Sequence, residues 1–477
     1  MTQLRNGSTT AWTFAITSIA LFMVALDNLV VTTALPVIRA DLGASLQDLE
    51  WTVNAYTLTF AVLLLTGAAL GDRFGRRRMF IIGVTIFTIG STIAALAPSS
   101  SVLILARATQ GVGGAIVTPL TLTILSAAVS PARRPLALGA WGGIGGLAIA
   151  IGPVVGGAIA QGLNWHWIFW LNVPIGIVAA ILGYFRLEET YGPRARLDIP
   201  GLALASTGLL AVVWATINGN ERGWTEPTIL AAYIVGGILL LAFVAWELRT
   251  SEPMLPPDMF RNRGFTAANT ASLLMYFGMF GSVFLLAQFF QVVQGMNPFE
   301  AGLRVLPWTA MPAFVAPIAG VLSGRIGPRP IIATGLTLMA IGLAWLAAIV
   351  TPTTPYISFV LPFIISGAGM GMFFAPIANV VLSAVRRDEE GKASGANNAI
   401  REVGGVFGVA VLAAVFAAKG SYFDPQAYVN GLVPAMWIGA AVVAVAAVAA
   451  LFIPNHVVGQ IEDDKLVIDA TAEPAAG

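Results

Sequence analysis

Cysteine is absent from the chain, and histidine occurs only twice, as His166 and His456. These absences exclude disulfide frameworks, thiol catalysis and the usual zinc sites, because each of them needs cysteine or several histidines. They also leave no constellation for an enzyme. Charge is scarce as well: 10% of the 477 residues are charged, whereas a soluble domain carries roughly 25%. The 25 basic and 24 acidic residues nearly cancel, which argues against a nucleic-acid partner.

Apolar residues dominate the composition instead. Hydrophobic residues make up 57% of the chain, which also holds 51 glycines and 27 prolines. High hydropathy with abundant glycine and proline is typical of transmembrane helices that pack closely together. The composition therefore predicts an all-α polytopic membrane protein with the lipid bilayer as its partner.

The apolar runs are long enough to be counted as membrane spans. A helix that crosses about 30 Å of hydrocarbon needs about 20 apolar residues, and windows of this length predict about fourteen spans. The predicted spans are 12–36, 48–70, 79–97, 102–126, 136–162, 166–186, 199–218, 227–248, 266–294, 302–323, 329–350, 356–385, 397–419 and 431–453. The grouping of six, two and six helices predicts an N-terminal bundle, 1–198, two inserted helices with a linker, 199–265, a C-terminal bundle, 266–453, and a disordered tail, 454–477.

The loop charges predict the orientation of these spans. An even number of spans puts both termini on one side, and most basic residues fall in the loops of that side. The opposite side holds Arg39, Arg222, Arg304 and Lys419, and Arg107 lies within a span. By the positive-inside rule we expect both termini in the cytoplasm, with the protein in the plasma membrane.

A glycine-bounded motif follows the second span and is echoed in the second half. Its residues are Gly67, Asp72, Arg73, Gly75 and Arg76, followed by two further arginines; the echo has Gly320, Gly324, Arg325, Gly327 and Arg329. Such an echo predicts the parallel internal repeats of a transporter. The first copy resembles the loop signature of the major facilitator superfamily, from which the second departs by having Gly324 in place of the acid.

Two further segments resemble the fourteen-span drug:proton antiporter branch of that family: Leu26 to Pro36 with Asp27, and Trp165 to Pro174 with His166 where arginine is more usual. Arg107 to Gly114 resembles the fourth-span motif shared by proton-coupled members, and Gly152, Pro153, Gly156 and Gly157 resemble the fifth-span antiporter motif. The resemblance implies two six-helix bundles plus two extra helices, in a monomer that exports hydrophobic, often cationic compounds in exchange for protons by alternating access.

The energy source follows by elimination. The only lysines are Lys392, Lys419 and Lys465, and none of them completes a phosphate-binding loop. Uphill transport must therefore draw on an ion gradient, without a cofactor. One charge that crosses 100 mV is worth about 2.3 kcal/mol.

Asp27 is the acid placed deepest in a span, and Glu402 is its nearest rival. From the predicted span ends, the depths of Asp27 and Arg107 differ by only about 6 Å, within reach of an arginine side chain. Burial disfavours a carboxylate whereas a cation favours it, so protonation of this acid can depend on conformation. We therefore expect Asp27, Arg107 and Glu402 to couple transport to protons. The alternative is a static ion pair that only fixes the packing of two helices.

The family resemblance implies that the loop motif is a cytoplasmic gate as well as a topogenic signal. Asp72 would bind the positive end of a helix in the other half, where Arg401 is a candidate neighbour. In the fifth span, the glycines around Pro153 predict close packing, and a functional reading adds a bend on which the halves rock.

Polar residues in apolar spans suggest a substrate chamber. Gln288, Gln291 and Gln294 recur at about one-turn spacing, so they cannot all face lipid. Aromatic side chains bind cations through their π faces. The candidate chamber residues are Tyr56, Trp141, Tyr276, Gln288, Gln291, Phe374, Asn379 and Asn398. Two other functions stay open: a dedicated exporter of one metabolite, antibiotic or lipid, and a passive facilitator.

Overall fold

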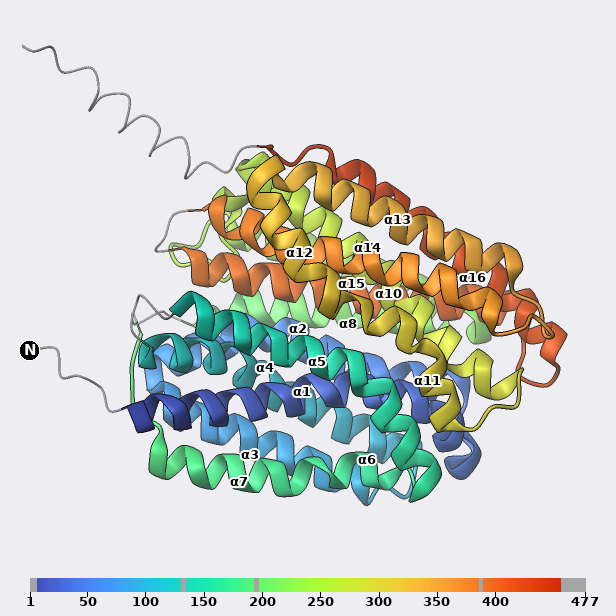
Figure 1. The fold of residues 1–477 in the computed structure, drawn as a ribbon, viewed down its shortest axis with the longest axis horizontal. Helices are drawn as coiled ribbons and strands as arrows, with labels where there is room; N and C mark the ends of the chain where they lie inside the picture. The colour runs from blue at the N-terminus through green and yellow to red at the C-terminus, as the bar shows by residue number, and fades with distance from the viewer. Residues whose placement is uncertain (1–6, 130–133, 193–196, 386–388, 456–477) are drawn as a thin grey trace, which may run out of the picture.

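The computed structural model describes residues 7–129, 134–192, 197–385 and 389–455. Within these ranges the chain is helical and contains no strand. Figure 1 shows two groups of helices, one above the other, with α1 to α7 in the lower group and α10 to α16 in the upper. We call these groups the N half and the C half.

The helices of the N half follow the predicted spans closely. They are α1 (Gly7–Leu42), α2 (Leu46–Phe74), α3 (Arg76–Ala95), α4 (Ser100–Ala128), α5 (Arg134–Gly162), α6 (His166–Trp170) and α7 (Asn172–Arg186). The short α6 and α7 together form one span, His166–Arg186, with a break at Leu171.

Two inserted helices and the C half complete the chain. The inserted helices are α8 (Ile199–Arg222) and α9 (Pro227–Glu247). The C half has η2 (Pro257–Arg261), α10 (Arg263–Val292), α11 (Pro298–Thr309), α12 (Met311–Ile326), α13 (Pro328–Ile349), α14 (Ile357–Ser383), α15 (Glu390–Lys419) and α16 (Pro425–Ala450). The short α11 and α12 share one span, Pro298–Ile326, which breaks at Ala310.

The span count agrees with the sequence. Thirteen spans in the described residues are long and apolar enough to cross a membrane, and α5, a 29-residue helix, occupies the predicted fifth span. The predicted all-α fold with about fourteen spans is confirmed. Several helices extend beyond the predicted ends, because polar first turns continue a helix without raising its hydropathy. α15, predicted from 397, begins at Glu390, and α2 is capped by Ser45 in a capping box with Asp48.

The two halves meet along a seam. We call the end at which α1 begins the inner end and the opposite end the outer end; in Figure 1 they lie at the left and right. At the seam α2 packs against α15, and α5 packs against α11. Side chains join the halves at the outer end, where Gln291 Nε2 donates to Thr33 O over 2.7 Å and the Arg39 guanidinium lies 3.9 Å from the centre of the Tyr422 ring.

The inserted helices pack against each other and lie beside the seam. α8 contacts α9, α2 and α15. Asn220 at the end of α8 donates to Ala414 O of α15. At the opposite end, Trp246 Nε1 donates to Asp198 Oδ1 over 2.8 Å. The predicted tail lies outside the described residues from residue 456 onward.

Candidate functional site

Asp27 lies inside the N half and is 2% exposed. Arg107 Nη1 of α4 approaches its Oδ2 atom to 2.5 Å. Two amides donate to its Oδ1 atom: Gln110 Nε2 of α4 over 3.0 Å and Asn172 Nδ2 of α7 over 2.6 Å. Both carboxylate oxygens therefore accept hydrogen bonds from buried donors. Each of these donors belongs to the N half.

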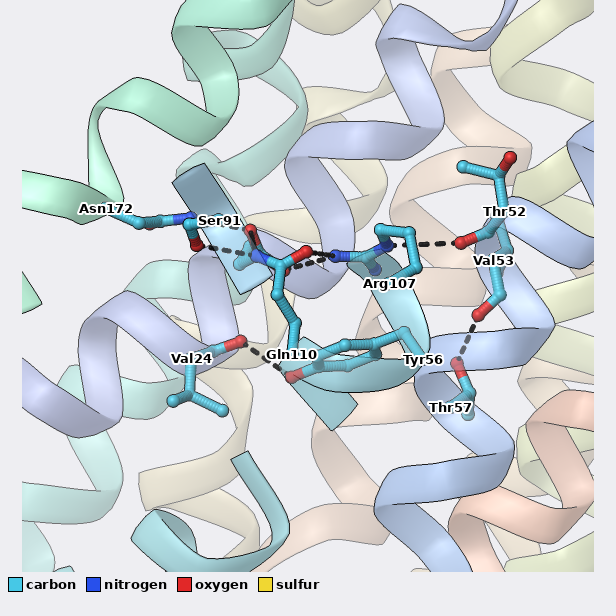
Figure 2. A network of polar contacts seen from close by, with 10 residues as sticks. Val24, Thr52, Val53, Tyr56, Thr57, Ser91, Arg107, Gln110 and Asn172 are labelled. Atoms are coloured by element: carbon cyan, nitrogen blue, oxygen red, sulfur yellow. Dashed lines mark hydrogen bonds and ion pairs between the residues drawn. The ribbon is translucent and has the colours of Figure 1, made fainter. Parts of the chain in front are cut away.

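Arg107 is fully buried and is held on several sides (Figure 2). Its Nε atom donates to Thr52 O of α2 over 3.1 Å, and its Nη1 atom donates to Gln110 Oε1 over 3.0 Å. Its guanidinium carbon lies 4.3 Å from the centre of the Tyr56 ring, a cation–π contact. Tyr56 Oη in turn donates to Val24 O of α1 over 3.3 Å.

Ser91 of α3 completes the network. Its hydroxyl oxygen accepts from Gln110 Nε2 over 2.8 Å and from Asn172 Nδ2 over 3.3 Å. The network thus takes side chains or carbonyls from five helices, α1, α2, α3, α4 and α7. A buried ion pair repays its desolvation only when further hydrogen bonds satisfy both partners. This arrangement meets that condition for both Asp27 and Arg107.

A second arginine and acid lie on α15 in the C half. Arg401 donates to Tyr276 Oη and, over 3.2 Å, to Asn398 Oδ1, and its guanidinium lies 4.6 Å from the centre of the Tyr276 ring. Phe374 packs against Tyr276 at 6.3 Å between ring centres. The structure therefore brings together four predicted residues, Tyr276, Phe374, Asn398 and Arg401.

Glu402 lies between this cluster and the Asp27 network. It interacts electrostatically with Tyr276 of its own half and with Tyr56 of the N half, which also interacts with Asp27 and Arg107. Its Oε2 atom is buried without a hydrogen-bond partner in the described part of the chain. Tyr56 is thus the residue through which the N-half ion pair faces an acid of the other half.

The network contains residues that the sequence did not single out as a site. Ser91, Gln110 and Asn172 bind Asp27 or its partners, although Gln110 and Asn172 stand in the segments that carry the family resemblance. Gln110 could have been predicted as a partner of Arg107, because it follows Arg107 by three residues and lies on the same face of the helix. Ser91 is an unremarkable serine in an apolar span and gives no such signal.

The gate residues occupy the inner end. Asp72 accepts from Arg76 Nε over 2.9 Å, and the Glu189 carboxylate accepts from the backbone N–H groups of Arg77 and Arg78 at the start of α3. Gly75 has a φ of 104°, which favours glycine. Arg73 is exposed, and a Cβ atom at Gly67 would overlap the backbone of α4 at Ala115. The contacts of Asp72 lie in its own half, whereas its candidate neighbour Arg401 contacts Tyr276.

The antiporter motif lies where α5 meets two other helices. Cβ atoms at Gly152 and Gly156 would overlap Leu29 and Val30 of α1, and one at Gly157 would overlap Pro298 of α11. In return, a Cβ at Gly302 of α11 would overlap Pro153. These glycines therefore let α5 approach α1 within the N half and α11 across the seam. The predicted bend at Pro153 stays a prediction.

The remaining chamber residues are dispersed. Gln291 binds Thr33 at the outer end, where Gln288 Oε1 accepts from Tyr422 Oη over 2.8 Å. Trp141 Nε1 donates to Thr121 Oγ1 of α4 over 3.3 Å, and Asn379 is exposed. The described side chains contain no group of three or more His, Asp or Glu that could hold a metal ion.

Comparison with known proteins gives one family. The model of the Major Facilitator Superfamily matches residues 17–409 and 268–465. The chain is 36% identical over 408 residues to multidrug resistance protein Stp of Mycobacterium tuberculosis (strain CDC 1551 / Oshkosh), covering 85% of this chain and 76% of that protein. It is 32% identical over 419 residues to the tetracenomycin C resistance and export protein of Streptomyces glaucescens, covering 87% and 78%.

Solved structures share the fold at low sequence identity. The crystal structure of a D-xylose–proton symporter matches with a TM-score of 0.65 and 16% identity, covering 93% of this chain and 98% of that one. A bacterial homologue of the human lysosomal transporter Spinster matches with a TM-score of 0.64 and 16% identity, covering 94% and 97%.

Proposed function

Because this chain belongs to the Major Facilitator Superfamily, as a multi-pass membrane transporter, we propose that it exports hydrophobic, often cationic compounds in exchange for protons. The family match supports transport by alternating access. The names of the relatives Stp and the tetracenomycin C export protein support drug-like substrates. In this proposal the protein lies in the plasma membrane with its inner end in the cytoplasm, and acts as a monomer.

The buried pair of Asp27 and Arg107 carries the coupling proposal. An acid deep in a span persists only with a partner or a function, and intramembrane ionisable residues are commonly functional. Asp27 would bind the proton when Arg107 withdraws toward Tyr56 and Thr52, and would release it when the pair re-forms. Each change would alter the electrostatic environment of Glu402, because Glu402 interacts with Tyr56 from the other half. Proton and substrate would then favour states that open to opposite sides.

The test is transport by purified protein in liposomes with an imposed pH gradient and a panel of lipophilic cations, anions and neutral compounds. The wild type should accumulate a substrate uphill. Asp27→Asn should lose this uphill transport at every pH while it still exchanges substrate downhill. Asp258→Asn is the matched control, because Asp258 is an exposed carboxylate paired with Arg261 outside the spans. Full pH-driven activity of Asp27→Asn would remove Asp27 from the mechanism.

A dedicated exporter of one antibiotic is the second candidate. It is favoured by the name of the Streptomyces glaucescens relative, which specifies a single compound. The same panel separates the two functions, since a dedicated exporter should respond to one compound and its close analogues.

A further inference from the structure

Glu50 is a buried acid that the transport proposal does not use. It lies on α2 near the outer end and is 2% exposed. Its Oε2 atom has no hydrogen-bond partner among the described residues. One turn further inward on the same helix, both amide atoms of Asn54 are buried and without a partner in the described chain. The outer part of α2 thus presents two orphaned polar side chains on one face.

This face of α2 is directed toward the C half. Glu50 interacts electrostatically with Tyr422, which lies between α15 and α16. Tyr422 is the residue that Arg39 of α1 covers and that donates to Gln288 of α10. Glu50 is therefore close enough to Tyr422 to interact with a residue that joins the halves at the outer end. Burial at these contacts raises the pKa of the Tyr422 phenol, so Tyr422 remains a neutral donor.

Charged groups around Glu50 are engaged elsewhere. The guanidinium of Arg39 lies over the Tyr422 ring. The acids near this end are Asp27, paired with Arg107; Asp41, bound by Trp165; Asp48 and Glu300, in the capping boxes of α2 and α11; Glu221, bound by Gln47; and Glu226 and Asp424, which cap α9 and α16. Of the other bases, Arg222 lies over the Trp214 ring, Arg304 lies over the Tyr356 ring, and Lys419 is exposed. Within the described residues, Glu50 has no ion pair.

An acid in this position cannot stay ionised when the outer end is closed. Burial of an unpaired carboxylate removes the hydration of a charge, whereas the protonated acid loses only the hydration of a neutral group. Separation of Arg39 from Tyr422 would admit water to Glu50 and stabilise its carboxylate. Closure and proton binding are therefore linked, because the closed state favours the proton-bound form.

We propose that Glu50 is a proton-binding site for the water at the outer end, and that the two halves close there only after it has taken up a proton. The proton joins the carboxylate before closure and returns to the same water when the outer end reopens. It is therefore separate from the protons exchanged for substrate. The site makes the rate of the cycle depend on outside pH and leaves the stoichiometry unchanged. This inference rests on the proposed function in that closure of the outer end is a step of the transport cycle.

The experiment measures the opening of the outer end directly. Because the chain has no cysteine, Leu163→Cys and Phe423→Cys introduce two unique sites for spin labels. Both residues are exposed, at 64% and 95%, and belong to opposite halves. Distances between the labels, measured by double electron–electron resonance in nanodiscs, report the closed and open populations. As the pH rises from 5 to 9, the ratio of closed to open protein should fall by up to about tenfold per pH unit while Glu50 loses its proton.

Glu50→Gln carries a permanently neutral side chain of the same shape, so its ratio of closed to open protein should not change with pH across this range. The control Glu221→Gln removes an exposed acid of the same end and should keep the wild-type response. An unchanged response of Glu50→Gln overturns the proposal. If Glu50→Gln does not fold, the labelled protein with Glu50 intact still tests the proposal. Label distances that do not change with pH in that protein would overturn the proposal equally.

Transport measurements distinguish a failure of the role proposed for Glu50 from a failure of the proposed function. In liposomes, Glu50→Gln should still accumulate substrate uphill but lose the dependence of its rate on outside pH. A wild type without any pH-driven transport would contradict the proposed function. A wild type with such transport, beside a Glu50→Gln protein that keeps the wild-type dependence on outside pH, would contradict only the role of Glu50.

Discussion

Each half has an arginine and an acid within its spans, and the surroundings of the two pairs differ. Asp27 and Arg107 bind each other and are enclosed by donors and acceptors of the N half. Arg401 and Glu402 are neighbours on α15 and each has an unsatisfied atom, Nε and Oε2, in the described chain. The first pair is thus complete, in that its charged groups find their partners within one half. The second site is open, in that polar atoms of Arg401 and Glu402 at the seam lack partners in the described chain.

This difference separates two kinds of buried charge. A rigid movement of the halves leaves the contacts between Asp27 and Arg107 unchanged, because their partners move with them. The same movement changes what Glu402 meets, since Tyr56 faces it from the other half. We infer that the acids at the seam, Glu402 and Glu50, respond directly to this movement, whereas the pair of Asp27 and Arg107 responds only when a contact across the seam displaces Arg107. Tyr56 is the contact that connects the two sites.

Loss of an arginine should have the largest effect and should differ between the sites. Arg107→Met leaves Asp27 buried without its cation and should lower the free energy of unfolding by about 3–5 kcal/mol. Arg401→Met should lower the free energy of unfolding by less. Arg401 is only partly buried, and it forms no ion pair with Glu402 in the described chain whose loss would leave a bare charge. The thermal midpoints of both variants in one detergent measure the difference.

A double variant provides the control for this prediction. Asp27→Asn added to Arg107→Met removes the orphaned charge and should recover much of the lost stability, without pH-driven transport. Equal losses for Arg107→Met and Arg401→Met would remove the distinction between a complete and an open site.

The amides around Asp27 should show the next largest effect. Asn172→Leu removes a donor to the carboxylate, and a buried charged group that loses a hydrogen bond costs about 1–3 kcal/mol. Asn398→Leu, which removes an acceptor from the partly exposed Arg401, should cost less than half of this. Chemical denaturation of the two purified variants tests the contrast, and a larger loss for Asn398→Leu would contradict it.

Most of the fold could be predicted from hydropathy alone, because a membrane imposes length and polarity on each span. The depth argument placed Asp27 and Arg107 at one level, and the structure has them in contact. Their role in coupling stays a prediction. Ser91 and Asn172 could not be predicted as partners, because their contacts depend on how α3 and α7 pack around α1. The spacing of residues in the sequence predicts which side chains share a helix face, whereas the packing of the helices determines which residues that face contacts.

The glutamines of α10 illustrate the same limit. Their one-turn spacing correctly indicates that they avoid lipid, since Gln288, Gln291 and Gln294 all have protein partners. Their partners depend on packing: Gln288 and Gln294 bind Tyr422 and Thr354 of their own half, whereas Gln291 reaches Thr33 of the other half. A polar stripe within a span therefore signals a protein contact, and a substrate chamber is only one form of it.

Tyr56 should give a smaller effect that tests the connection between the two sites. Tyr56→Phe keeps the ring over Arg107 but removes the hydrogen bond to Val24 O, at a cost of about 0.5–1.5 kcal/mol. It should leave pH-driven transport in place. Tyr56→Leu also removes the cation–π contact and should weaken coupling further. Liposome transport by the two variants compares them, and equal coupling would exclude the ring as the connection.

Glu402→Gln should have the smallest effect on stability and an appreciable effect on transport. The buried Oε2 atom has no partner in the described chain, so a neutral amide can replace the acid at a cost within about 1 kcal/mol. Because the amide cannot be ionised when the seam opens, the rate of pH-driven transport should lose part of its pH dependence. Asp258→Asn, which removes an exposed acid outside the spans, is the control for loss of a carboxylate away from the seam. A large loss of stability in Glu402→Gln would show that the acid is ionised and bound in the closed seam, which would make the C-half site as complete as the pair of Asp27 and Arg107.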